Sequence, residues 1–194
     1  MSTLPTFASY DGHFITPRLV IGAWPRPEHV DEIAAAGVRG IVNLVALCRR
    51  DAMAYVHHLP EHVHWMHVAM WDGFLAEGAS CTETLTEGYA RLLVQQAAIV
   101  MRDHSPVLVH CMGGQGRAGN VGAILLAASE GLTPDEASAK IRARRPSIAP
   151  FFHDGFWRHA GGDALVALAR QVLDEPTTPP ALLCQRVRGE VGTA

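Results

Sequence analysis

Apolar residues along this chain gather in short runs, which are separated by longer amphipathic stretches. Four of these runs have the length of a β-strand and end at turn-forming or polar residues; they cover 18–23, 40–45, 62–70 and 106–110. The run at 40–45 is apolar almost throughout, which is typical of a parallel strand buried on both faces. We therefore predict four strands at these positions.

Helical patterns fill most of the intervals between the predicted strands. Thr133, Pro134 and Glu136 form a strong helix start, in which threonine caps the first turn and glutamate follows three residues later. The predicted helices cover 28–36, 82–104, 117–130, 133–145 and 150–172, with a weaker candidate at 48–58. Strands that alternate with helices predict an α/β fold, with a central, mostly parallel sheet of four to five strands and helices on both faces.

The chain of 194 residues has the length of one domain with a substantial core. Residues 1–17 are polar and turn-rich, and we expect a loosely held N-terminal lead-in there. The folded domain is expected over 18–174. A Pro-rich C-terminal tail is expected over 175–194.

Composition narrows the class of protein. The net charge is −3, so the basic face that usually binds nucleic acid is not indicated. The most apolar stretch, 121–128, is far shorter than the ~20 residues of a membrane span, and the N-terminus lacks the pattern of a signal peptide. The four cysteines form no Cys-x-x-Cys pair; they are Cys48, Cys81, Cys111 and Cys184. We therefore expect a reduced, cytoplasmic protein.

The strongest chemical signal lies between the predicted strand at 106–110 and the predicted helix at 117–130. Cys111 and Arg117 flank five residues, three of which are glycine. Such a segment can curl until its backbone N–H groups form an anion nest, and the following helix adds its positive end. The planar fork of Arg117 suits two phosphoryl oxygens. A phosphate dianion is therefore expected to bind here without a metal or another cofactor, against Met112, Gly113, Gly114, Gln115, Gly116 and Arg117.

Two further roles follow from the same chemistry. A thiol at a helix N-terminus beside an arginine ionises readily, so Cys111 is the candidate nucleophile. A phenolate leaves poorly unless it is protonated, and a general acid is therefore needed. Asp72 is our candidate because it follows a predicted strand in a Trp-Asp-Gly turn. Asp51 and Asp103 are weaker candidates because neither follows a strand.

The pattern His-Cys-x-x-Gly-x-Gly-Arg-x-Gly at 110–119 resembles the signature of the protein tyrosine and dual-specificity phosphatase superfamily. The segments 19–25 and 40–44, the Asp72-Gly73 turn and the Arg145-Pro146 pair are similar to the small single-domain dual-specificity-like members. The resemblance covers about residues 18 to 160.

The resemblance implies a dual-specificity phosphatase-like fold and a protein phosphatase that hydrolyses phosphotyrosine through a phosphocysteine, with phosphoserine and phosphothreonine left open. It implies Cys111 as nucleophile, Arg117 as phosphate clamp and Asp72 as general acid. It also implies that amides of 112–117 line the phosphate site and that His110 supports the loop. The expected partner is a phosphorylated protein or a small phosphomonoester.

Three departures from the family pattern bear on turnover. Ala118 stands where serine or threonine usually follows the arginine, and in the family that hydroxyl helps the phosphoenzyme to break down. We therefore predict slow phosphocysteine hydrolysis. The glutamine that often positions water has no evident match in 151–155, and the usual proline is absent from the loop at 70–73.

Other functions remain open at this stage. The glycines at 114, 116 and 119 also match a dinucleotide fingerprint, but that motif gives no reason for Cys111 and Arg117. Rhodaneses also cradle an anion beside a cysteine, typically in a shorter loop. A phosphatase-like binding module with little turnover is favoured by Ala118. Phosphoinositides rank lower as substrates because 112–116 contain no lysine.

Several other residues suggest weaker hypotheses. A histidine cluster invites a metal interpretation, although a solvated or half-buried cluster is the favoured account; it comprises His57, His58, His62, His64 and His67. Cys48 or Cys81 is a candidate resolving thiol if Cys111 oxidises. We interpret Arg142, Arg144 and Arg145 as a solvated helix end.

Overall fold

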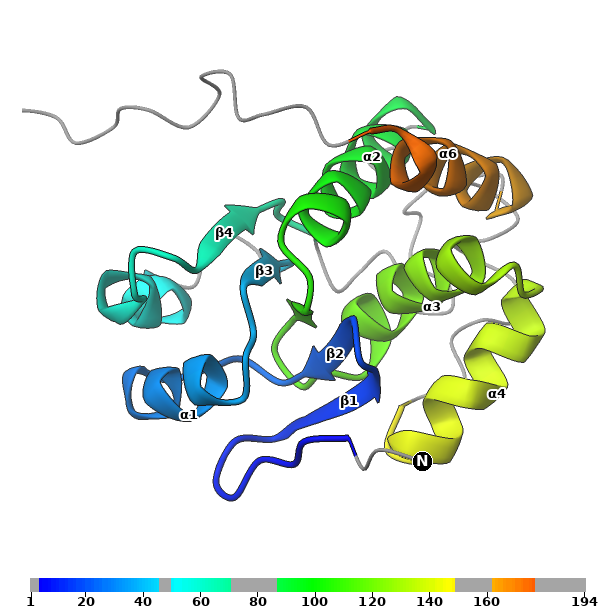
Figure 1. The fold of residues 1–194 in the computed structure, drawn as a ribbon. Helices are drawn as coiled ribbons and strands as arrows, with labels where there is room; N and C mark the ends of the chain where they lie inside the picture. The colour runs from blue at the N-terminus through cyan, green and yellow to red at the C-terminus, as the bar shows by residue number, and fades with distance from the viewer. Residues whose placement is uncertain (1–3, 46–49, 71–86, 149–161, 177–194) are drawn as a thin grey trace, which may run out of the picture.

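A five-stranded sheet forms the centre of the protein (Figure 1), which we describe from a computed structural model over residues 4–45, 50–70, 87–148 and 162–176. The strands lie in the order β1-β2-β5-β3-β4. β1 is antiparallel to β2, and every other neighbouring pair is parallel. The strands are β1 (Gly12–Thr16), β2 (Leu19–Gly22), β3 (Gly40–Asn43), β4 (His64–His67) and β5 (Val107–His110). The predicted α/β fold with a mostly parallel sheet is confirmed.

Helices cover both faces of this sheet. The described helices are η1 (Pro27–His29), α1 (Val30–Ala35), η2 (Arg50–His58), α2 (Glu87–Asp103), α3 (Gly116–Glu130), α4 (Pro134–Arg144) and α6 (Gly162–Asp174). One core joins the sheet to α2, α3, α4 and α6. A second core joins it to α1 and η2. In Figure 1 the first group lies to the right of and above the sheet, and α1 lies to its left.

Side chains of the central strands alternate between the two cores. In β2, Leu19 and Ile21 belong to the larger core, whereas Val20 belongs to the smaller one. The strands β3 and β5 alternate in the same way. A strand that is buried on both faces reads as a continuous apolar run. This is why these three strands were visible in the sequence.

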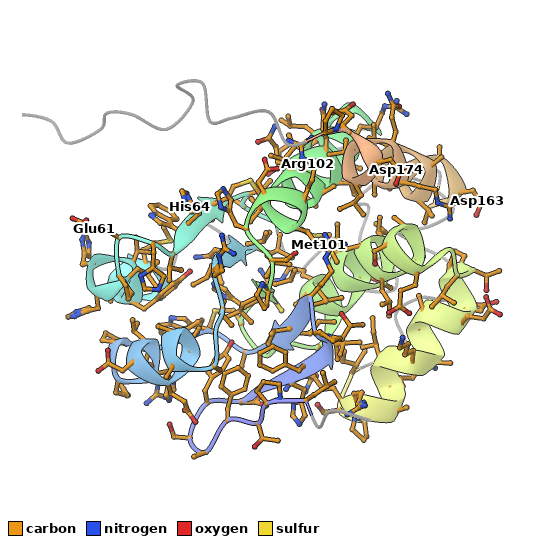
Figure 2. All side chains as sticks on the ribbon, viewed as in Figure 1. Glu61, His64, Met101, Arg102, Asp163 and Asp174 are labelled. Carbon is orange, nitrogen blue, oxygen red and sulfur yellow. The ribbon has the colours of Figure 1, made fainter. Side chains whose placement is uncertain are left out.

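Figure 2 labels side chains from the interior and from the rim of the molecule. Met101, near the end of α2, is 1% exposed and belongs to the larger core. Glu61 and Asp163 are exposed and point outward at the rim of the molecule. Among the described residues, no helix has both the length and the apolar character needed to cross a bilayer.

The start of α4 has the predicted capping arrangement. The amide of Glu136 donates to Oγ1 of Thr133 at 3.3 Å, and the amide of Thr133 donates to the Glu136 carboxylate at 2.8 Å. These two bonds satisfy amide groups that the first turn leaves unpaired. The long helix α3 ends just before this cap, at Glu130, and the φ of 70° at its C-cap residue Gly131 suits a glycine.

The N-terminal segment differs from our expectation of a loosely held lead-in. Residues 12–16 form strand β1, and Phe14 and Ile15 are buried. The carboxylate of Glu32 on α1 accepts hydrogen bonds from the amides of Ser9 and Tyr10. The expectation is therefore wrong for residues 8–16. It failed because this five-residue strand lies between two turn-rich segments and carries too short an apolar pattern to stand out.

Candidate active site

The candidate loop lies at the carboxyl edge of the sheet. β5 ends at His110, and α3 begins at Gly116, so residues 111–115 connect a buried strand to a helix N-terminus. Cys111 is 3% exposed and Arg117 is 2% exposed, whereas Gln115 between them is exposed. Gln115 precedes α3 without a side-chain cap, and the first turn contains no acidic residue. Such a helix terminus favours an anion.

Gly114 lies against the backbone at the end of β2. Its φ is +64°, which favours glycine. A Cβ atom at this position would lie 2.4 Å from the carbonyl carbon of Gly22. The amide of Trp24 also donates to the carbonyl of Met112 at 3.0 Å. The loop is therefore packed directly on the segment that follows β2.

Arg145, at the end of α4, holds the outer side of the loop. Its Nε donates to the carbonyl of Gly114 at 3.1 Å, and its Nη2 donates to the carbonyl of Gly113 at 3.2 Å. In a planar trans peptide, the C=O and the following N–H point in opposite directions. The amides of Gly114 and Gln115 consequently point away from Arg145.

This position of Arg145 corrects one of our hypotheses. We expected Arg142, Arg144 and Arg145 to form a solvated helix end, but Arg145 is only 1% exposed. Arg142 is half-buried and Arg144 is exposed. The Arg-Pro pair in the family resemblance was the available signal, but sequence alone does not show which carbonyls an arginine will reach.

The guanidinium of Arg117 joins the loop to two neighbouring strands. Its Nη1 donates to the carbonyls of Leu44 at 3.1 Å and Met70 at 2.7 Å. Leu44 follows β3, and Met70 lies just after β4. Two carbonyl acceptors on one nitrogen fix the plane of the guanidinium, so this fork is oriented before any ligand arrives.

His110 contacts the start of the loop from inside the protein. The hydroxyl of Tyr55 lies 2.8 Å from Nε2 of His110, and Nδ1 of His110 lies 3.4 Å from the carbonyl of Cys111. Burial lowers the pKa of His110 to about 3, and burial raises the pKa of Tyr55. Both groups are therefore neutral at physiological pH. Nothing in the sequence pointed to Tyr55, which lies in the weakly predicted helix.

The remaining predicted residues fall into two groups. In the loop, Met112 and Gly116 are half-buried and Gly113 is exposed, while Ala118 is fully buried at the start of α3. Several others lie outside the described residues, namely Asp72, Cys48, Cys81, Cys184 and 151–155. The role of Asp72 as general acid therefore stays a prediction.

The histidines were the basis of the metal hypothesis. His64 of β4 stacks on His104, with ring centroids 3.6 Å apart. His67 donates from Nε2 to the carbonyl of Val45 at 2.6 Å. Within the described parts of the chain, no three His, Cys, Asp or Glu side chains gather in a way that could hold a metal ion.

The sequence of this chain matches a known family of phosphatase domains, in agreement with the geometry of the site. Residues 13–150 match the family PTP-SAK, described as the Swiss Army Knife protein, DSP-PTPase phosphatase domain. The chain belongs to this family. The resemblance to dual-specificity phosphatases drawn from the sequence is thereby confirmed, and the PTP-SAK match begins inside β1 rather than at residue 18.

One curated relative of this PTP-SAK chain is viral. The protein named "Putative tyrosine phosphatase 067L", from Invertebrate iridescent virus 3, is 25% identical over 138 residues. The match covers 70% of this chain and 54% of the viral protein. The chain therefore spans about half the length of that relative.

Solved phosphatase structures share the fold of this PTP-SAK chain. Human DUSP28 is 19% identical with a TM-score of 0.56, and the match covers 83% of this chain and 96% of DUSP28. TpbA of P. aeruginosa, in complex with phosphotyrosine, is 15% identical with a TM-score of 0.55, covering 87% and 93%. PTPMT1 in complex with PI(5)P is 16% identical with a TM-score of 0.56, covering 83% and 96%. At these identities the likeness establishes the fold.

Proposed function

We propose that this chain is a phosphomonoesterase that transfers the phosphoryl group of its substrate to Sγ of Cys111. The main support is the burial of two residues and the direction of the loop carbonyls between them. Cys111 and Arg117 are both buried at the two ends of a loop whose carbonyls at 113 and 114 are held on the outside by Arg145. A loop whose carbonyls are held outward directs its N–H groups toward an anion on the inside.

Each group in the site has a separate role in phosphoryl transfer. The loop amides and the N-terminus of α3 attract three phosphoryl oxygens, and the guanidinium of Arg117 compensates charge that develops on them. Sγ of Cys111 attacks phosphorus in line with the leaving oxygen. The neutral ring of His110 contacts the carbonyl of Cys111, and the hydroxyl of Tyr55 contacts that ring in turn.

The reaction proceeds in two displacements. In the first, an S–P bond forms, the P–O bond to the leaving group breaks, and the leaving oxygen takes a proton from Asp72. In the second, water attacks phosphorus, its proton passes to the Asp72 carboxylate, and the S–P bond breaks to release inorganic phosphate. The part of Asp72 rests on the family resemblance, because this residue lies outside the described structure.

Phosphotyrosine is the substrate class that we propose. Residues 112–116 contain neither lysine nor arginine, so little charge is available for a head group with several phosphates. TpbA was solved with phosphotyrosine and PTPMT1 with PI(5)P. We therefore expect a phosphotyrosyl protein or a small aryl phosphomonoester to be preferred over a phosphoinositide, with phosphoserine and phosphothreonine as slower substrates.

A second candidate is a phosphoprotein-binding module with little turnover. Ala118 favours it, because this buried methyl group replaces the hydroxyl that assists phosphoenzyme breakdown in the family. The two candidates differ in rate rather than in binding. A stable phosphocysteine with a very low steady-state rate would identify the binding module.

The test compares four substrates in the presence of a chelator: p-nitrophenyl phosphate, a phosphotyrosyl peptide, a phosphoseryl peptide and a monophosphorylated phosphoinositide. The expected result is hydrolysis of the two aryl phosphates, abolished in Cys111→Ser. No turnover by the wild type, or unchanged turnover by Cys111→Ser, would overturn the proposal. Transfer of sulfur from thiosulfate to cyanide would indicate the rhodanese alternative instead.

A further inference from the structure

We infer that Asp11 and Arg145 act together as positioning residues, which fix two amide groups of the phosphate loop and thereby set its affinity for an oxyanion. The inference rests on the proposed function and names residues outside the 110–119 motif. Asp11 belongs to the N-terminal segment, and Arg145 follows α4, so neither is near the loop in sequence.

One guanidinium connects three separate segments. Nη1 and Nη2 of Arg145 donate to the two carboxylate oxygens of Asp11, at 2.7 and 2.9 Å. Nε and Nη2 donate to the loop carbonyls of Gly114 and Gly113. Nη1 also lies 2.9 Å from Nδ1 of His13, which accepts in this geometry. The bidentate pair with Asp11 fixes the plane of the guanidinium, and that plane decides where the loop carbonyls can lie.

The loop needs such an external constraint. Three of the five residues between Cys111 and Arg117 are glycines, which permit the curled backbone but do not fix it. Gly113 is exposed, and a Cβ atom there would have its nearest neighbour 4.0 Å away, so packing does not hold it. The bond from Arg145 to its carbonyl supplies the restraint that packing does not.

Asp11 is itself held in place from two sides. Its carbonyl accepts from the amide of Ala23 at 2.8 Å, on the segment against which Gly114 packs. The preceding residue, Tyr10, donates from its hydroxyl to the carbonyl of Ala23 at 2.6 Å. The amide of Tyr10 donates to the carboxylate of Glu32 at 3.0 Å. The carboxylate of Asp11 therefore approaches Arg145 from a fixed backbone.

The two partners differ in their exposure to solvent. The side chain of Arg145 is 1% exposed, but that of Asp11 is 62% exposed. The buried guanidinium depends on its partners, since removing one of them leaves a buried charge less well compensated. The directional bonds of the ion pair also determine the orientation of the buried guanidinium. The charge of that guanidinium also polarises the two peptide groups it contacts, which strengthens their N–H groups as donors.

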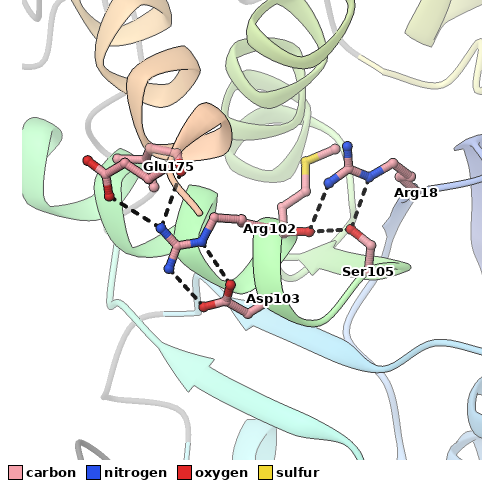
Figure 3. Close-up of polar contacts among 7 residues, drawn as sticks. Arg18, Arg102, Asp103, Ser105 and Glu175 are labelled. Carbon is pink, nitrogen blue, oxygen red and sulfur yellow. Dashed lines mark hydrogen bonds and ion pairs between the residues drawn. The ribbon is translucent and has the colours of Figure 1, made fainter. Parts of the chain in front are cut away.

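The protein offers a matched control for Asp11. Asp103 also makes a bidentate pair with Arg102, accepting from Nε and Nη2 at 2.8 and 2.9 Å, and Glu175 accepts from Nη1 of the same arginine (Figure 3). That pair lies at the end of α2, just before β5, and so at the end of the sheet opposite the loop, which also places Asp103 too far away to be the alternative general acid. Asp103→Asn therefore removes the same kind of interaction away from the site.

The experiment measures tungstate binding by calorimetry in a Cys111→Ser background, so that it reports oxyanion affinity without turnover. Asp11→Asn is expected to weaken tungstate binding about five- to tenfold, whereas Asp103→Asn leaves it unchanged. Thermal unfolding of both variants reports any change in stability separately from the change in affinity. A purely structural role would move the unfolding temperature of Asp11→Asn but not its affinity.

Arg145→Lys tests whether the two residues act through each other. Lysine keeps the charge but loses the fork, so the affinity should fall at least as far as in Asp11→Asn. Adding Asp11→Asn to Arg145→Lys should cost little more. Equal affinity in Asp11→Asn and its parent would overturn the inference, even if Arg145→Lys fails to fold. If the parent binds no tungstate and the wild type hydrolyses no aryl phosphate, the proposed function falls, and this inference falls with it.

Discussion

Ala118 is the residue at which this chain departs most directly from the family chemistry. It is fully buried at the start of α3, one residue after Arg117. We predict that Ala118→Ser raises kcat for p-nitrophenyl phosphate about 10- to 150-fold, because a hydroxyl that bonds the departing thiolate is worth roughly 1.5–3 kcal/mol. Rapid-mixing kinetics provide the measurement. The wild type should show a burst of p-nitrophenol, and the variant should not; an unchanged kcat would contradict the prediction.

Tyr55 provides a second prediction for a single residue. Tyr55→Phe keeps the ring but leaves Nε2 of His110 without its hydroxyl partner inside the protein. An unsatisfied buried polar group costs about 1–3 kcal/mol, so the free energy of unfolding in urea should fall by that amount. The value of kcat/KM should also fall, because His110 supports the backbone of Cys111. A variant with wild-type stability would show that the hydroxyl contributes nothing.

At the residue scale, the sequence predicted those features of the site whose residues lie close together in the chain. Cys111 and Arg117 are six positions apart, and the fold indeed brings strand, loop and helix together around them. Arg145 and Tyr55 were missed or misassigned, because their partners lie more than 30 residues away in the chain. Only the packed fold decides which buried carbonyl or ring nitrogen such a side chain reaches.

Among the structural elements, the loop at 111–115 leaves no room for a side chain at Gly114. Gly114→Ala would require a Cβ at a φ of +64° and 2.4 Å from Gly22. We predict that it lowers kcat/KM by about 100-fold or more, because displacement of a binding loop by about 1 Å can cost that much. Gly113→Ala is the matched control, because its Cβ would meet only Gln115, at 4.0 Å. Equal activity of the two alanine variants would contradict the prediction.

The elements themselves were predicted to different degrees. β2, β3 and β5 were found because burial on both faces leaves a continuous apolar run. β4 is shorter than the predicted strand at 62–70 and covers only His64–His67. Its first two residues are exposed at the sheet edge, so its pattern is weak. β1 was missed because an antiparallel edge strand of five residues is defined mainly by its hairpin partner.

For the whole molecule, the alternation of strands and helices was sufficient to predict the layered architecture. It did not predict that Asp11 of the N-terminal segment accepts from Arg145, or that Tyr10 donates to the carbonyl of Ala23. The free energy of such long-range bonds depends on the relative placement of three segments. Sequence patterns describe each segment separately, so they do not predict contacts that form only when the three segments pack together.

The buried His110 makes the stability of the whole protein depend on pH. Burial lowers its pKa from 6.5 in the unfolded chain to about 3 in the folded protein. Between these values the unfolded chain binds a proton that the folded protein does not, so the free energy of unfolding falls as the pH drops. The slope approaches about 1.4 kcal/mol per pH unit for one such group. Above pH 6.5 neither state binds the proton, and this contribution to stability is constant.

Urea denaturation between pH 6.5 and 4.5 measures this dependence. We predict that the wild type loses stability more steeply than His110→Asn over this range, although the variant is less stable at pH 7. Burial also lowers the pKa of His13 and His104, and these residues contribute equally in both proteins. The carboxylates of Asp11 and Asp103 have pKa values held below 3.8 by their arginine partners, so their contributions are lost only at lower pH. The difference between the two slopes therefore isolates His110, and equal slopes would show that its ring is not held neutral in the folded protein.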